Sequence, residues 1–131
     1  MTTTRVRGTF DVKLAPQPTD DATLGRMTID KQFHGALVAT SQGQMLTAGT
    51  DVKGSAGYVA IERVSGTLGG RTGTFVLQHS GTMTRGAPQL TITVVPDSGT
   101  GELAGLTGTM LIDVSNGAHA YDFAYTLAPA P

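Results

Sequence analysis

One stretch of this chain occurs twice and decides the fold: "GTLGGRTGTFVLQHS" from Gly66 to Ser80, and "GELAGLTGTMLIDVS" from Gly101 to Ser115. Both copies follow the pattern Gly-x-Leu-x-Gly-x-Thr-Gly-Thr and then run into a strand of alternating apolar residues. Glycine at the entrance to a strand permits a positive φ angle and a sharp bend, which is one way to curl a sheet. Two such bends in one short chain predict equivalent corners of a single curved β-sheet.

The rest of the chain shows the same period-two alternation, which indicates half-buried strands. Helical spacing of apolar residues does not persist over three turns anywhere, and glycines recur throughout. The predicted strands cover residues 4–14, 26–33, two short strands within 34–52 joined by a turn at 41–44, 58–64, 72–80, 90–95, the second copy of the repeat, and 118–127. Eight or nine antiparallel strands are typical of a sandwich or a barrel.

The composition fits one all-β domain spanning residues 1–131, with a frayed tail at 128–131. The 131 residues are 39% hydrophobic and only 15% charged, and 18 of them are glycine. Weakly charged edge strands expose unpaired backbone groups that can pair with another chain. Closing the sheet on itself removes those edges. We therefore expect an antiparallel β-barrel of eight or nine strands rather than an open sandwich.

Charge and residue usage argue against several classes of function. The net charge of −1 and the absence of Trp predict neither a nucleic-acid nor an anionic membrane partner. The chain has no Cys, which removes thiolate zinc sites and cysteine nucleophiles and fits a cytoplasmic protein. No phosphate-binding loop is present, and His34, His79 and His119 lack the local spacing of a metal site, so no cofactor and no metal are expected.

Alternation also assigns the faces of the strands. Phe75, Leu77 and His79 share one face of the first repeated strand, as do Met110, Ile112 and Val114 in the second copy. The last strand carries His119, Tyr121, Phe123 and Tyr125 on one face. If these faces line the lumen, the lumen is mostly apolar, and its few polar groups are the imidazoles of His79 and His119 and the tyrosine hydroxyls. A small barrel of this kind is either filled by side chains or holds one small ligand.

Three stretches carry a resemblance to a known family: "YVAIERVSGTLGGRTGTFVLQHSGT", "VVPDSGTGELAGLTGTMLIDV" and "HAYDFAYTL". They resemble a bacterial family of small domains of unknown function whose fold is similar to the allene oxide cyclase barrel, which also resembles plant dirigent proteins. The similarity runs from Lys31 to Leu127 and includes the first strand. It implies an eight-stranded antiparallel barrel whose lumen can admit a small apolar molecule, and related barrels include cofactor-free cyclases. It also suggests a homodimer, as does a surface poor in charge.

The candidate catalytic residues are His79, His119 and Arg71. His79 can act as an acid or base near neutral pH, or it can be a structural imidazole satisfied by a carbonyl or a Tyr hydroxyl. His119 can join it at one barrel mouth or lie in solvent. The residues expected to contact a ligand are Tyr58, Glu62, Phe75, Leu77, Tyr121, Phe123 and Tyr125.

Two further charged positions have alternative interpretations. Glu62 and Arg71 lie on consecutive strands and are expected to form an ion pair, either as a structural contact or as an anchor for a polar ligand group. Lys31 interrupts an apolar face and is expected at the rim, where its ammonium reaches water, although an amine with a perturbed pKa is the alternative.

Two functions from different classes fit these observations. The first is a barrel that binds a small apolar molecule in its lumen, as a binding protein or as a cofactor-free isomerase or cyclase. The second is a filled barrel with a non-enzymatic structural or interaction role. Asn116-Gly117 is a strong hairpin signal, and backbone self-processing beside Asp113 and Asn116 is a remote third reading.

Overall fold

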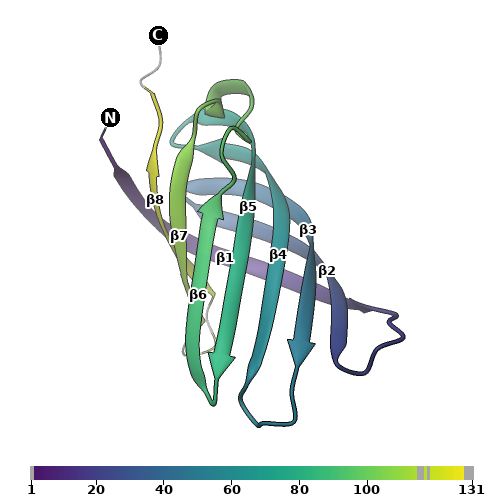
Figure 1. Cartoon of the computed structure of the whole chain (residues 1–131). Coiled ribbons are helices and arrows are strands. Elements are labelled where there is room, and N and C mark those ends of the chain that lie inside the picture. Colours follow the sequence, from purple (N-terminus) through teal and green to yellow (C-terminus); the bar gives the residue numbers. More distant parts are fainter. Residues whose placement is uncertain (1, 115–116, 118, 129–131) are drawn as a thin grey trace.

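The chain forms a closed antiparallel barrel in which every strand pairs with its neighbours in sequence and β1 pairs with β8. The computed structural model describes residues 2–114, 117 and 119–128. The eight strands are β1 (Thr4–Gln17), β2 (Leu24–Gly35), β3 (Leu37–Gly49), β4 (Ala56–Leu68), β5 (Arg71–Thr84), β6 (Ala87–Val94), β7 (Thr107–Asp113) and β8 (Ala120–Thr126). The all-β, eight-stranded antiparallel barrel expected from the sequence is confirmed (Figure 1).

The predicted turn at residues 41–44 is wrong, because β3 runs through it without a break. Ser41 pairs with Val64 and Gly43 pairs with Glu62 in a continuous register with β4. A Cβ atom at Gly43 would lie 2.2 Å from the Ile61 carbonyl oxygen, so this glycine permits a close approach of two strands. The "SQG" signal therefore reflects tight packing inside a sheet and not a reversal of the chain.

The two copies of the repeated stretch meet at the same end of the barrel, at the top of Figure 1. The first copy forms the β4–β5 hairpin, and the second forms a single 3₁₀ turn, η1 (Gly101–Leu103), that leads into β7. Gly70 and Gly105, which are equivalent in the repeat, have φ angles of 81° and 86°. The copies also touch, since the amide of Thr72 donates a hydrogen bond to Glu102 Oε1 over 3.0 Å.

Apolar side chains fill the lumen at this end. The largest fully buried apolar side chains are Phe33, Phe75, Phe123, Leu37, Leu68, Leu77, Ile92, Leu103, Leu106 and Val64. The rings of Phe75 and Phe123 stack with their centroids 6.0 Å apart. The inward faces predicted for β5 and for Tyr121 and Phe123 are thus confirmed, but Val114 lies beyond the end of β7 and is 56% exposed.

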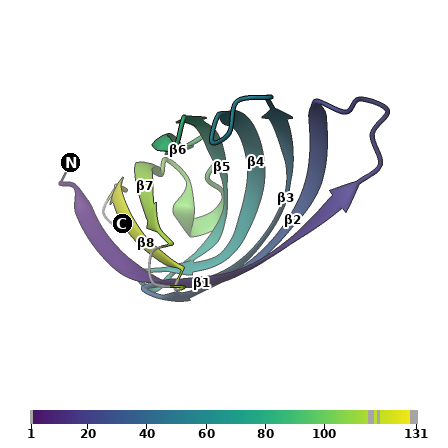
Figure 2. The same ribbon diagram turned by 90° about the horizontal axis from the view of Figure 1, so that it is seen from below.

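The other end of the barrel is less completely enclosed, because β7 and β8 are short. The pairing of β1 with β8 ends at Thr9, whereas the pairing of β1 with β2 continues to Gln17. Between β6 and β7 the one register pair is Thr93 with Thr109, and both strands are fully described. Figure 2, which views the barrel from below, shows β1 to β6 curving in one continuous sheet.

Candidate functional site

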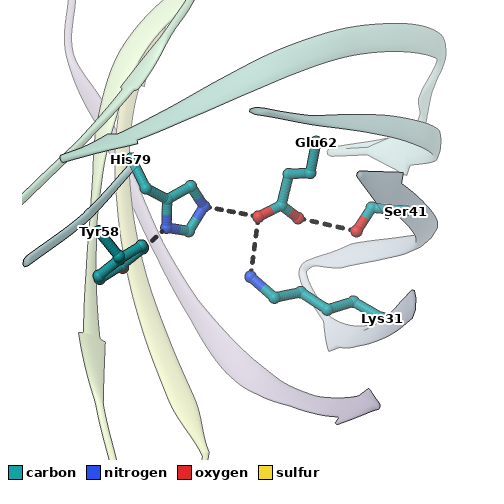
Figure 3. Close-up of polar contacts among 5 residues, drawn as sticks. All are labelled: Lys31, Ser41, Tyr58, Glu62 and His79. Carbon is teal, nitrogen blue, oxygen red and sulfur yellow. Dashed lines mark hydrogen bonds and ion pairs between the residues drawn. The ribbon is translucent and has the colours of Figure 1, made fainter. Parts of the chain in front are cut away.

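Four polar side chains from four consecutive strands meet inside the lumen (Figure 3). They are Lys31 on β2, Ser41 on β3, Glu62 on β4 and His79 on β5. Each has the sequence parity of its strand's buried apolar neighbours, so the pleat that turns those neighbours inward turns these side chains inward too. We call these four residues the lumen cluster.

The carboxylate of Glu62 is the centre of the lumen cluster. Its Oε2 atom accepts hydrogen bonds from Lys31 Nζ at 2.8 Å and from His79 Nε2 at 2.6 Å, and its Oε1 atom accepts one from Ser41 Oγ at 2.7 Å. Glu62 and Ser41 are 0% exposed, His79 is 4% exposed and Lys31 is 7% exposed. A fully buried carboxylate is tolerated here because three donors and an opposite charge replace the water that it has lost.

The electrostatic balance at Glu62 favours its ionised form. Burial by itself raises the pKa of the Glu62 carboxyl, but the hydrogen bond from His79 and the charge and hydrogen bond of Lys31 outweigh it. Together they lower the pKa of Glu62 from 4.5 to about 2. Glu62 is therefore a carboxylate near neutral pH and can only accept hydrogen bonds.

The position of Lys31 corrects the expectation that it reaches the rim of the barrel. Its ammonium pairs with Glu62 inside the lumen and also lies 5.1 Å from the ring centre of Phe10 and 5.7 Å from that of Phe33. Aromatic faces attract a cation, and the attraction strengthens where water is excluded. The carboxylate and two rings thus solvate the amine, and this makes the buried position stable.

Tyr58 extends the lumen cluster toward the open end. Its hydroxyl lies 3.3 Å from His79 Nδ1, and the two rings are tilted with centroids 6.1 Å apart. Because an ionised Glu62 has no proton to donate, the hydrogen between it and His79 is on Nε2. Tyr58, His79 and Glu62 therefore form a linear chain of acid–base groups. Burial, and then the charge of Glu62, raise the pKa of Tyr58, so its hydroxyl stays protonated.

An apolar pocket of about 360 Å³ adjoins Tyr58 at the open end of the barrel. Its walls come from β4, β5, β6 and β7, and its lining residues are Ala56, Gly57, Tyr58, Gly81, Thr82, Met83, Pro88, Gln89, Leu90 and Ile112. This volume lies within the range of pockets that hold small organic molecules. Tyr58 is the residue that joins the pocket to the lumen cluster.

Gly81 sets the position of the Tyr58 ring. The two residues are register partners on β4 and β5, and a Cβ atom at Gly81 would lie 2.6 Å from Tyr58 Cε1. The missing side chain leaves the space that the aromatic ring occupies. Gly81 follows His79 by two residues on the same face, so one short segment supplies both the imidazole and the room for its tyrosine partner.

The expected ion pair between Glu62 and Arg71 does not form. In the β4–β5 register Arg71 pairs with Leu68, at the hairpin end, whereas Glu62 pairs with Leu77. The guanidinium of Arg71 instead donates a hydrogen bond to the carbonyl oxygen of Ala128 over 2.6 Å. Consecutive strands of an antiparallel pair run in opposite directions, so residues nine positions apart across a tight hairpin are separated along its length.

The remaining predicted residues lie in three different settings. His119 is exposed, with its ring centroid 5.2 Å from that of Phe10, so it is not part of the lumen cluster. The hydroxyl of Tyr121 donates to the His34 carbonyl oxygen at 2.8 Å and accepts from the Leu37 amide at 2.9 Å, and burial raises its pKa. Phe75, Leu77, Phe123 and Tyr125 belong to, or pack against, the filled end of the core. Their roles in binding stay predictions.

Sequence reasoning did not identify Ser41 as a member of the site, and it did not assign Lys31 to Glu62. A signal was available, because both charged residues fall on the apolar parity of their strands. Two opposite charges on inward faces of one small barrel need each other as partners. Ser41 carried no such signal, since serine is also common in turns.

The described residues contain neither a metal-binding group of side chains nor a membrane-spanning helix. Within residues 2–114, 117 and 119–128, no three His, Cys, Asp or Glu side chains are grouped so that they could hold a metal ion. Over the same residues, no helix has the length and apolar character needed to cross a membrane. Asn116, and with it the predicted Asn116-Gly117 turn and the self-processing reading, falls outside the described residues.

The fold and the site together define a small closed antiparallel barrel that is filled at one end and has a buried, charge-paired cluster beside an apolar pocket at the other. The chain belongs to the DUF3224 family, described as "Protein of unknown function (DUF3224)", whose model matches residues 6–125. A DUF3224 protein of unknown function from Shewanella oneidensis MR-1, whose crystal structure is solved, is 55% identical. The match covers 98% of this chain and 100% of that one, with a TM-score of 0.93. No curated protein matched the chain. The wider resemblance to allene oxide cyclase and dirigent barrels stays a prediction.

Proposed function

We propose that this protein binds a small, largely apolar molecule in the pocket at the open end of the barrel. The observation that carries this proposal is the pairing of an apolar pocket of about 360 Å³ with one polar residue, Tyr58, that is backed by a buried charged cluster. Binding sites for small molecules commonly combine apolar walls with a few well-placed polar groups.

The finer part of the proposal is that the bound molecule is isomerised or cyclised without a cofactor. Such a reaction needs a group that removes a proton and returns it elsewhere, together with walls that hold the substrate in a reactive shape. The chain from Tyr58 through His79 to the Glu62 carboxylate supports this, because an imidazole held by a carboxylate can accept a proton and stay stabilised as an imidazolium.

A matched pair of tryptophan variants tests the binding site. Ile112 lines the pocket, whereas Leu111, its neighbour on β7, points outward and is 61% exposed. We expect Ile112→Trp to fill the pocket and abolish binding of 2-methoxynaphthalene measured by fluorescence titration, and Leu111→Trp to leave binding unchanged. Failure of the wild-type protein to bind, or equal binding by both variants, would overturn the proposal.

The isomerase part needs a separate measurement. Native mass spectrometry of the protein purified from its host identifies any molecule it retains. On incubation with fresh protein, that molecule is expected to keep its mass and change its chromatographic retention time. An unchanged retention time rejects catalysis while leaving binding intact.

The alternative is a filled barrel with a structural or interaction role. It is favoured by the packing of the lumen around Phe75 and Phe123, which leaves one end of the barrel without room for a ligand. The wild-type titration separates the two functions, because a purely structural barrel binds no apolar probe. The expected homodimer also stays a proposal, which size-exclusion chromatography with light scattering tests.

A further inference from the structure

We propose that two copies of this chain associate through the outer surface of β3, β4 and β5, on the side of the barrel wall away from the lumen. These strands lie side by side at the front of the barrel in Figure 1. The centre of this surface, which we call the outer patch, consists of Gln44, Leu46, Val59, Ile61 and Gln78. The inference goes beyond the proposed function, because the outer patch shares no residue with the pocket beside Tyr58.

The outer patch is continuous across the three strands. Leu46 on β3 and Val59 on β4 are register partners, and Ile61 lies two residues further along the same face of β4. Each of these three side chains is at least half exposed. Together with the two glutamines they line a hollow of about 430 Å³. Large apolar side chains that gather around a hollow on the surface are typical of a site that another molecule covers.

The outward faces of the barrel differ in charge. The strands β3, β4 and β5 lie wholly within the described residues, and Arg63 is the one charged side chain at their outward positions. The outward positions of β1 and β2 carry Arg5, Arg7, Asp11, Lys13, Arg26 and Asp30. Charged residues are depleted at the centres of protein interfaces, because burial removes their water. The face that holds the outer patch is therefore the one that a partner can cover at the lowest cost.

A second copy of the chain fits this face because the glutamines are arranged symmetrically. Gln44 and Gln78 are the register partners of Ile61 on its two sides. A two-fold axis that passes over Ile61, between the copies, brings glutamine opposite glutamine. Each primary amide both donates and accepts hydrogen bonds, so two such side chains can satisfy each other. The patch is thus complementary to itself, as the interface of a two-fold dimer must be.

Arg63 selects the direction of the two-fold axis. An axis along the strands would place Arg63 opposite Arg63 of the other copy, and like charges in contact are unfavourable. An axis across the strands instead places Arg63 over Val59 of the other copy and keeps the two guanidinium groups apart. In this arrangement the two β4 strands cross face to face and Ile61 lies at the axis.

The size of the face suits a dimer. The strands β3, β4 and β5 are 13, 13 and 14 residues long. At roughly 3.3 Å per residue and about 4.8 Å between strands, the three strands present roughly 600 Å². A standard interface buries about 800 Å² on each partner, and the adjoining strands β2 and β6 can supply the difference.

Light scattering coupled to size-exclusion chromatography tests the inference with two charge variants. The wild-type protein is expected to have about twice the 13.5 kDa mass of one chain. Ile61→Glu places two carboxylates opposite each other at the axis and is expected to shift the protein to the monomer. Leu111→Glu changes an equally exposed apolar residue on β7, outside the outer patch, and should leave the dimer intact. Both positions are exposed, so both variants should keep the wild-type circular dichroism spectrum.

Cysteine cross-linking provides a second measurement that does not depend on a destabilising charge. The chain has no Cys, so Ile61→Cys and Leu111→Cys each carry a single thiol. A short bis-maleimide reagent is expected to join Ile61→Cys into a covalent dimer and to leave Leu111→Cys as single chains.

Three results contradict the inference. A monomeric wild-type protein leaves the outer patch to a different partner, and a dimer that persists in Ile61→Glu uses another face. Equal cross-linking of the two cysteine variants shows that contact between copies is not specific to the patch. Each of these results leaves the proposed function standing, because titration with 2-methoxynaphthalene reports on the pocket alone.

Discussion

Glu62 is the residue on which the interior of this barrel depends. Its carboxylate is fully buried and connects Lys31, Ser41 and His79, which come from three other strands. A buried ion pair adds little net stability compared with apolar residues of the same shape, but the loss of one partner is costly because the other charge is left unpaired. The lumen cluster therefore makes the barrel sensitive to single substitutions.

Replacing Glu62 by Gln is expected to lower the free energy of unfolding by about 3–5 kcal/mol, because the Lys31 ammonium loses its carboxylate. Urea denaturation followed by circular dichroism measures the change. Asp30→Asn is the matched control, since Asp30 is exposed on β2 beside Lys31, and it should shift stability by less than about 0.5 kcal/mol. The double variant Lys31→Met/Glu62→Gln should be more stable than Glu62→Gln alone. If it is less stable, the loss is not due to an unpaired lysine.

The pH dependence of stability follows from the same carboxyl group. Its pKa is about 2 in the folded chain and near 4.5 when unfolded, so the unfolded chain takes up the proton first as the pH falls. The stabilisation from ionised Glu62 is fully present above about pH 4.5 and is lost as the pH falls toward 2, a contribution of about 3 kcal/mol. Urea midpoints measured from pH 6 to pH 3 should fall more steeply for the wild type than for Glu62→Gln. Parallel curves for the two proteins would exclude this role of Glu62.

At the scale of single elements, the repeated stretch uses its glycines in two physical ways. Gly70 has a positive φ angle and no described atom within 4 Å of a Cβ placed on it. Gly73, in the Thr-Gly-Thr segment, would place a Cβ 2.0 Å from the Thr100 carbonyl oxygen. The first glycine serves the backbone conformation, and the second permits β5 to approach the segment that comes just before the second copy.

This difference predicts unequal effects of two alanine substitutions. Gly70→Ala should cost about 1 kcal/mol, because only the left-handed conformation is penalised. Gly73→Ala should cost about 3 kcal/mol or more, because the Cβ meets backbone that cannot move aside easily. Thermal denaturation of the two variants measures both effects. A larger loss for Gly70→Ala would contradict the assignment.

At the scale of the whole molecule, the closure of the barrel is uneven. β3 and β4 pair continuously from Leu37 and Leu68 to Gly49 and Ala56, whereas the described register of β6 with β7 is the single pair Thr93 and Thr109. Openings of a folded protein start where the backbone pairing is sparse. The seam between β6 and β7 borders the pocket through Leu90 and Ile112, so its opening would also admit a ligand.

Native-state hydrogen exchange tests this uneven closure. Amides of β6 and β7 next to the seam are expected to exchange at least ten-fold faster than central amides of β3 and β4, because they open without global unfolding. Uniform protection across all eight strands would show that the barrel opens only as one unit. Protection that rises at the seam on addition of 2-methoxynaphthalene would connect this opening to the pocket.

Period-two alternation and the doubled glycine pattern were sufficient to predict an antiparallel barrel of eight or nine strands and the inward faces of His79, Phe75 and Phe123. These signals are local, since the alternation of apolar and polar residues within each strand indicates which of its faces is buried. The turn misplaced at residues 41–44 shows the limit of local signals, because Gly43 is required by a neighbouring strand and not by its own segment. The site was predictable in part. Glu62, His79 and Tyr58 were selected, and a Tyr hydroxyl was one of the partners predicted for His79, but the pairing of Glu62 with Lys31 and Ser41 was not predicted.

The sequence alone determined the fold class and the inward parity of Lys31, Glu62 and His79. The tertiary structure decided that Glu62 pairs with Lys31 and not with Arg71, and that Tyr58 stands between His79 and the pocket. The physical reason is that parity within a strand is a local property, whereas the register between strands fixes height along the barrel. Two side chains can face the same lumen and still lie too far apart along its axis to meet.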